Sequence, residues 1–384
     1  MRVEAMVREL IGGCSSVVHA VRLGTVVKLV EGIIRGGRLS PATIGRSLRG
    51  SALPKHEIKR VDRLLGNPKM SGDRRLLFHA IARRLLSGAE RPVILVDWTQ
   101  ACGTHVALVA AVPIGGRALP IYSEVHPLKK LGNVGVETRF LRALKAIVPP
   151  ECKCLVVTDA GFKGPFFSKV VDSGWDFLGR VRGTTKAIST TGETISKEQF
   201  YARASTTPVE LGAFGLFVKQ RIPCRLMLVR KRRRPGPKRP PPACKEQREL
   251  RQSALDPWLL ATSLFDGDAA AVVRLYAKRM QIEETFRAAK NHRFGWSLGT
   301  VRLSTPERAA VLLALAALAF LVITLIGMAV ERSGRHRAYQ ANTETRRVLS
   351  LLVLATAILR RAENLCSLGD FRVSLASIPS LVVL

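Results

Sequence analysis

Residues 91–125, RPVILVDWTQACGTHVALVAAVPIGGRALPIYSEV, decide the fold class. The segment holds three apolar runs rich in β-branched residues, which predict three strands: RPVILVDWT, THVALVAAVPI and RALPIYSEV. Gly115-Gly116 separates the second run from the third, as in a β-hairpin. The chain continues with a predicted helix, strand, helix and strand, at 138–147, 153–159, 165–173 and 176–183. This order predicts an α/β domain with a mixed sheet.

The regions outside these elements are basic. Residues 1–89 predict short helices, one beginning at Ser40-Pro41 and one running from Pro54 to Leu65. Their Lys and Arg side chains suit contact with a DNA backbone, and suit a solvated helical cap equally well. Residues 184–256 contain a predicted strand pair and the run RKRRRPGPKRPPP, which its prolines keep from being helical. That run fits either a nuclear-localisation signal or a phosphate-binding loop.

The overall composition narrows the class of protein. Lys and Arg number 61 against 29 Asp and Glu in 384 residues, which gives a net charge of +32. This excess disfavours an ordinary small-metabolite enzyme and indicates a polyanionic partner inside the cell. The seven cysteines are scattered and odd in number, so they predict neither a disulfide framework nor a standard zinc site.

Residues 309–330, AAVLLALAALAFLVITLIGMAV, carry no charge and are long enough to cross a bilayer. The alternative is a helix buried on all sides in a large protein. The segment is single, rich in alanine and basic on both flanks, and it lacks an aromatic belt. These features favour the buried helix, and no membrane partner is expected.

Three carboxylates form a candidate site. Asp97 and Asp159 are each predicted to end an apolar strand, although a lone Asp in that position is more often a turn or cap residue. Residues 276–290, YAKRMQIEETFRAAK, predict one helix with Glu283 beside its buried stripe. The alternative is an exposed face on which Glu283 pairs with Arg279 or Arg287. Carboxylate oxygens suit Mg²⁺, and two such ions support phosphodiester chemistry.

Several motifs resemble the IS4-type bacterial transposases of the DDE group, over nearly the whole chain. VDWT at 96–99 resembles the first-Asp motif, and VTDAGFKGPFF at 157–167 resembles the second. GWDFLGRVRG at 174–183, IKRVDRLLGN at 58–67 and PWLLATSL at 257–264 resemble further family segments. Four residues reproduce the family's Y-(2)-R-(3)-E-(6)-K spacing: Tyr276, Arg279, Glu283 and Lys290.

The resemblance implies an RNase H-like core in two parts, 90–183 and 257–300, separated by a β-rich insertion at 184–256. Residues 1–89 would be a helical DNA-binding region, and residues 301–384 a helical C-terminal region that helps dimerisation. The resemblance assigns the metal ions to Asp97, Asp159 and Glu283, with two Mg²⁺ ions expected and Mn²⁺ as a substitute. It assigns contacts with the DNA strand to three side chains: Tyr276, Arg279 and Lys290. Arg287 is expected to contact the strand as well, because its position on the predicted helix places its positive charge near theirs.

The implied activity is cut-and-paste transposition of DNA. The family nicks double-stranded DNA at inverted-repeat ends, transfers the freed 3′-OH to target DNA, and works as a homodimer in a synaptic complex. A bacterial cytoplasmic, nucleoid-associated protein is therefore expected. Trp258 could stack a flipped base, but its segment predicts a core strand equally well. The alternative function is a catalytically decayed DNA-binding protein of the same fold.

Overall fold

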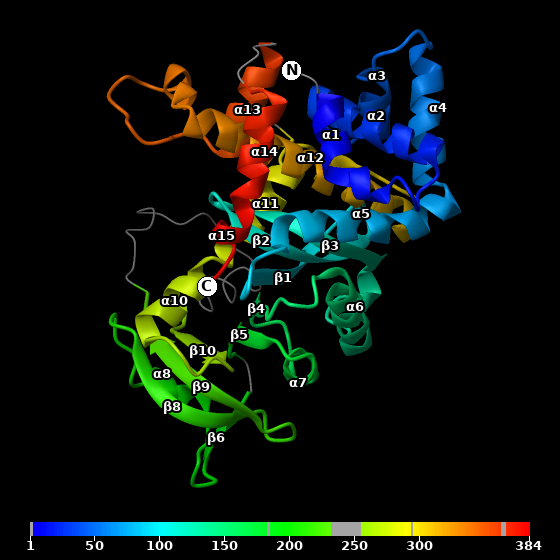
Figure 1. Ribbon diagram of the computed structural model, residues 1–384. Coiled ribbons are helices and arrows are strands. Elements are labelled where there is room, and N and C mark those ends of the chain that lie inside the picture. The colour runs from blue at the N-terminus through cyan, green and yellow to red at the C-terminus, as the bar shows by residue number, and fades with distance from the viewer. Residues whose placement is uncertain (1–2, 183–184, 232–254, 293–294, 362–365) are drawn as a thin grey trace, which may run out of the picture. The chain divides into compact units, whose positions relative to one another are not determined.

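The computed structural model describes residues 3–182, 185–231, 255–292, 295–361 and 366–384. Most of the basic, proline-rich run at 230–242 lies outside the described residues. The chain divides into two compact units (Figure 1). The first unit comprises Met1–Cys154 and Met280–Leu384, and the second comprises Leu155–Arg279. The second unit is therefore an insertion in the sequence of the first.

An antiparallel sheet in the order β3-β2-β1 lies in the first unit, with β1 at Val93–Gln100, β2 at His105–Ile114 and β3 at Arg117–Pro127. These are the three strands that residues 91–125 predict. Gly115 and Gly116 form the tight turn between β2 and β3 with φ of 59° and 87°, values that glycine adopts without steric cost. The predicted hairpin is confirmed.

Helices make up the rest of the first unit. The N-terminal part contains α1 (Val3–Ile11), α2 (Ala20–Gly36), α3 (Pro41–Arg46), α4 (Pro54–Leu65) and α5 (Pro68–Leu86). After the sheet come α6 (Val134–Ile147), α11 (Met280–Lys290), α12 (Pro306–Arg332), α13 (Leu351–Arg360), α14 (Leu368–Ala376) and α15 (Ile378–Leu381). α4 has the predicted bounds. Ser40 makes no side-chain capping hydrogen bond at the start of α3. Of the two residues that predict this start, Pro41 at the first helical position is therefore the one that the structure supports.

The apolar segment 309–330 lies within α12, the central helix of the first unit. Among the residues that the structure describes, α12 is the one helix long and apolar enough to cross a membrane. Its most apolar window is 94% buried, and it packs against α2, α5, β3, α13 and α14. Gly327 allows α13 to approach α12 closely, because a Cβ there would lie 2.6 Å from the carbonyl oxygen of Leu351. The burial agrees with a core helix.

A mixed sheet forms the second unit, in the order β4-β5-β10-β9-β8-β6-β7. Its first three strands are β4 (Leu155–Thr158), β5 (Asp176–Arg180) and β10 (Trp258–Thr262). The other four are β9 (Ile222–Val229), β8 (Val209–Leu216), β6 (Ala187–Ile188) and β7 (Thr194–Ile195). The helices are α7 (Gly164–Asp172), α8 (Lys197–Tyr201) and α10 (Ala269–Ala277). β4 and β5 are parallel and joined through α7, whereas the remaining pairs are antiparallel. The predicted mixed α/β architecture is confirmed.

The prediction of one helix over 276–290 is wrong. α10 ends at Ala277 and α11 begins at Met280. At the break, the amides of Lys278 and Arg279 donate to the carbonyls three residues earlier, which tightens the chain into a turn. Tertiary packing explains the break, because Tyr276 is anchored in the second unit by Trp258 and Ile282 is buried in the first. Tyr276 and Glu283 therefore lie on different helices, and their relative positions cannot be read from one helical projection.

Candidate active site

Asp97 lies within a strand, not at its end as predicted. β1 continues to Gln100, and Asp97 is half-buried at its fifth position. Its cross-strand neighbour is Val109, which in turn pairs with Ser123. Side chains at paired positions share one face of a sheet, and here Val109 and Ser123 line a small cavity with Phe286 of α11. Asp97 therefore belongs to the face of the sheet that α11 covers.

The backbone around Asp97 is held from both faces of the sheet. The Asp97 carboxylate accepts a hydrogen bond from the amide of Trp98 at 2.8 Å. The Trp98 indole, on the opposite face, donates to the carboxylate of Glu137 in α6 at 3.0 Å. Glu137 is 1% exposed. Trp98 is thus a packing residue that fixes the strand at Asp97.

Glu283 lies in the first turn of α11 and is half-buried. The helix is seated by Ile282, Thr285 and Ala289, which are buried on one side of it. The Thr285 hydroxyl accepts from the amide of Ala118 at 2.8 Å and lies 2.9 Å from the carbonyl oxygen of the same residue. This double contact ties α11 to the start of β3, so it determines where Glu283 projects.

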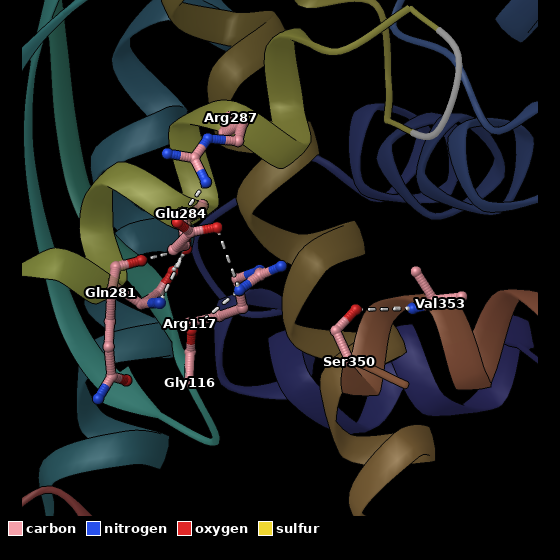
Figure 2. A network of polar contacts seen from close by, with 9 residues as sticks. Gly116, Arg117, Gln281, Glu284, Arg287, Ser350 and Val353 are labelled. Atoms are coloured by element: carbon pink, nitrogen blue, oxygen red, sulfur yellow. Dashed lines mark hydrogen bonds and ion pairs between the residues drawn. The ribbon is translucent and has the colours of Figure 1, made fainter. Parts of the chain in front are cut away.

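A second polar contact of α11 involves Glu284, the residue directly after Glu283. Figure 2 shows Glu284 between Arg117, at the hairpin turn, and Arg287, one helical turn away. The distances from nitrogen to carboxylate oxygen are 3.7 Å to Arg117 and 2.5 Å to Arg287. Arg287 therefore pairs with Glu284, at a spacing of three residues. Its side chain is 68% exposed, so this pair adds little to stability.

Lys290 closes α11 on the side of Asp97. Its side chain is half-buried. Burial lowers the pKa of the Lys290 ammonium, and the negative charge of Asp97 acts in the opposite direction. α11 packs against β1, the strand that carries Asp97. Within the first unit, α11 thus brings a cation toward the first predicted carboxylate and carries the third.

Asp159 directly follows β4 in the second unit, as predicted. It is half-buried, and its carboxylate accepts from the amide of Gly161 at 2.8 Å, which forms a tight turn. A Cβ on Gly161 would lie 3.1 Å from the Asp159 oxygen, so the glycine leaves room for this turn. The carboxyl end of a parallel strand is a common ligand-binding position in α/β sheets.

Tyr276 is 2% exposed, and its ring meets the ring of Trp258 edge-to-face at 4.8 Å. Burial raises the pKa of the Tyr276 hydroxyl to about 12, against the opposing charges of Arg279 and Arg180, and Arg279 also hydrogen-bonds this side chain. The hydroxyl is therefore protonated at neutral pH. Trp258 opens β10 as a buried residue, and the ammonium of Lys231 lies 3.7 Å from its ring centroid.

Arg180 is a further candidate site residue, which the sequence motifs do not indicate. It ends β5 and donates to the carbonyls of Asp256 and Pro257 at 3.0 and 3.3 Å. Its buried Nε has no hydrogen-bond partner among the residues described. Burial lowers the pKa of Arg180, and repulsion by Arg182 adds to the effect. The signal in the sequence was two arginines in GRVRG, directly after an apolar strand.

The candidate metal ligands have the chemistry that Mg²⁺ requires. Asp97, Asp159 and Glu283 are half-buried and supply only carboxylate oxygens, which are hard ligands. Within the described ranges, no three His, Cys, Asp or Glu side chains are grouped so that they could hold a metal ion. The structure brings Asp97 and the residues of α11 together in the first unit. It places Asp159, Tyr276, Arg279 and Arg180 in the second unit.

The sequence profile described as Transposase DDE domain matches residues 89–322, which is more than half of the chain. The chain therefore belongs to the DDE transposase domain family. No curated protein matches the sequence. Membership implies a transposase-type enzyme with DNA as its substrate, and DDE domains generally use divalent metals.

The buried hydroxyl of Tyr276 leads to a prediction about alkaline stability. A folded-state pKa of about 12, above the usual 10.0, means that the unfolded chain loses this proton first. The contribution of the Tyr276 hydroxyl to the free energy of unfolding is thus fully present below pH 10 and is lost as the pH rises toward 12. We expect Tyr276→Phe to show a shallower loss of stability than wild type over that window in urea unfolding. Equal slopes for the two proteins would contradict the raised pKa.

Proposed function

We propose that this protein is an IS4-type cut-and-paste transposase that binds transposon ends, cleaves them and joins them to target DNA. One observation carries the proposal within the matched region: Asp97 lies on the sheet face covered by α11, the helix that also bears Glu283 and Lys290. Asp97, Asp159 and Glu283 would hold two Mg²⁺ ions, with Mn²⁺ as a substitute. The bound ions would activate the attacking oxygen and stabilise the leaving one.

The chain's own cations position the DNA strand in this proposal. Lys290 in the first unit, and Arg279 and Arg180 in the second, would supply positive charge to the DNA phosphates. The Tyr276 hydroxyl, which is protonated, would donate to a phosphate oxygen. Arg287 and Trp258 remain predictions as DNA contacts. In the structure Arg287 is held by Glu284, and Trp258 is covered by Tyr276 and Lys231.

The larger organisation follows the same proposal. Residues 90–183 and 257–300 form an RNase H-like core, 184–256 its β-rich insertion and 1–89 a DNA-binding region. Residues 301–384 contribute to a homodimer that assembles on paired transposon ends. The protein acts in the bacterial cytoplasm, on nucleoid DNA.

Metal removal tests this function. The full-length protein is incubated with a plasmid that carries the inverted repeats found beside its own gene. We expect nicking at the repeat ends with Mg²⁺ and with Mn²⁺, and none after EDTA, because no protein cation replaces a metal ion between phosphate and carboxylates. DNA binding without nicking in any divalent metal would favour the catalytically decayed alternative.

A further inference from the structure

Two adjoining hollows lie in the first unit, between the N-terminal helices and α13. The larger has a volume of about 590 Å³ and the smaller about 240 Å³. They share Gly37, Thr356 and Arg360, so they form one continuous depression. We call it the α2–α13 cleft, lined by residues 34–49 from the N-terminal part and 352–360 from the C-terminal part.

Arginines line this cleft from both segments. Arg35, Arg46 and Arg49 come from the N-terminal side and Arg360 from α13, while the smaller hollow adds Arg38. Arg35 is neutralised by Glu31 at 2.6 Å. The other four arginines are exposed, and none has a carboxylate partner within the described part of the chain. Among the residues that the structure describes, no acidic side chain lines either hollow.

Unpaired like charges on facing walls repel each other, and a bound anion relieves that repulsion. Small-molecule pockets are mostly apolar and enclose their ligand, whereas these guanidinium groups are open to solvent. An extended polyanion with regularly spaced charges fits this arrangement better than a single small anion. Arginine is also the residue that binds phosphate with two parallel hydrogen bonds.

The cleft is continuous with the helix that carries Glu283. His292, two residues beyond Lys290 at the end of α11, lines the smaller hollow. Trp296, just downstream, lines it as well, and its carbonyl accepts from the amide of Leu39 at 2.9 Å. A strand bound in the cleft therefore passes the end of α11.

We propose that the α2–α13 cleft binds the sugar-phosphate backbone of duplex DNA, with arginines of both walls on neighbouring phosphates. The C-terminal region then contributes a DNA contact through Arg360, in addition to the dimerisation expected of it. This inference rests on the proposed function, because DNA is its substrate.

The test measures binding of the full-length protein to a short fluorescent duplex of arbitrary sequence, by anisotropy over a range of KCl concentrations. The variants are Arg360→Ala and the double variant Arg46→Ala/Arg49→Ala. Each lost phosphate contact should reduce the slope of log affinity against log salt by about 0.9 and weaken binding by roughly tenfold at low salt. Arg360→Lys should restore most of the slope, because it keeps the charge.

Arg337→Ala provides the matched control, since Arg337 is exposed in the first unit and lies outside both hollows. Its slope should equal that of wild type, and circular dichroism melting should show all variants folded. If both Arg360→Ala and the double variant show the wild-type slope, the proposal that the α2–α13 cleft binds DNA is overturned. If the wild type nicks its ends while the cleft variants bind normally, only this inference fails. If the cleft variants bind DNA more weakly but the wild type never nicks its ends, the proposed catalysis fails and the DNA-binding role of the cleft is retained.

Discussion

Asp97→Ala, Asp159→Ala and Glu283→Ala should each abolish cleavage of end-containing DNA while leaving DNA binding intact. Each carboxylate is proposed to hold catalytic metal, and loss of one ligand removes transition-state stabilisation that no neighbouring side chain replaces. We expect single-turnover nicking with Mg²⁺ to fall by about a thousandfold or more, which corresponds to about 4 kcal/mol. Affinity measured in Ca²⁺ should be unchanged or slightly higher, because a negative charge beside DNA has been removed.

Asp172→Ala is the control for these variants. Asp172 ends α7 and pairs on the surface with Lys169 at 3.0 Å, so its removal should leave nicking at the wild-type rate. Near-normal nicking by any one of the three carboxylate variants would remove that residue from the proposed site. Normal nicking by all three would overturn the catalytic assignment as a whole.

Thr285→Val should have the second-largest effect, on both stability and cleavage. The substitution keeps the shape of the side chain but removes the hydroxyl that contacts the backbone of Ala118. The buried amide of Ala118 then loses its partner, at a cost of about 1–3 kcal/mol. Urea unfolding should show this loss, and nicking should fall because α11 no longer holds Glu283 in one place.

Thr138→Val separates this effect from simple loss of a hydroxyl. The Thr138 hydroxyl donates only to the carbonyl of Val134 within α6, at 2.9 Å, and it ties no helix to the sheet. We expect this variant to retain both stability and nicking. If Thr285→Val is destabilised but nicks at the wild-type rate, the contact is structural and does not position Glu283.

Much of the fold follows from local sequence patterns. The apolar runs of 91–125 and Gly115-Gly116 predict β1, β2, β3 and their hairpin, because strand propensity and turn chemistry agree there. The buried state of α12 also follows, since its basic flanks and alanine content favour a protein core. The DDE group, to which six motifs point, agrees with the matched domain.

The break between α10 and α11 could not be predicted from the sequence. Neither proline nor glycine stands at 278–279, and helix propensity continues through the segment. The turn depends on where Tyr276 and Ile282 are buried, which is information about distant residues. For the same reason Arg180 was missed, because its partners at 256–257 are far away in the sequence. The end of β1 was misplaced because polar residues after Asp97 still pair with β2.

The burial of α12 has a consequence for shortened copies of the gene. A polypeptide that stopped before residue 351 would contain this helix without α13 and α14, two of the elements that cover it. Its alanine- and leucine-rich surface would then face water and recruit other chains or chaperones. Gene copies disrupted near their 3′ end are thus expected to give aggregated, rapidly degraded products, and not stable inhibitors that occupy the transposon ends.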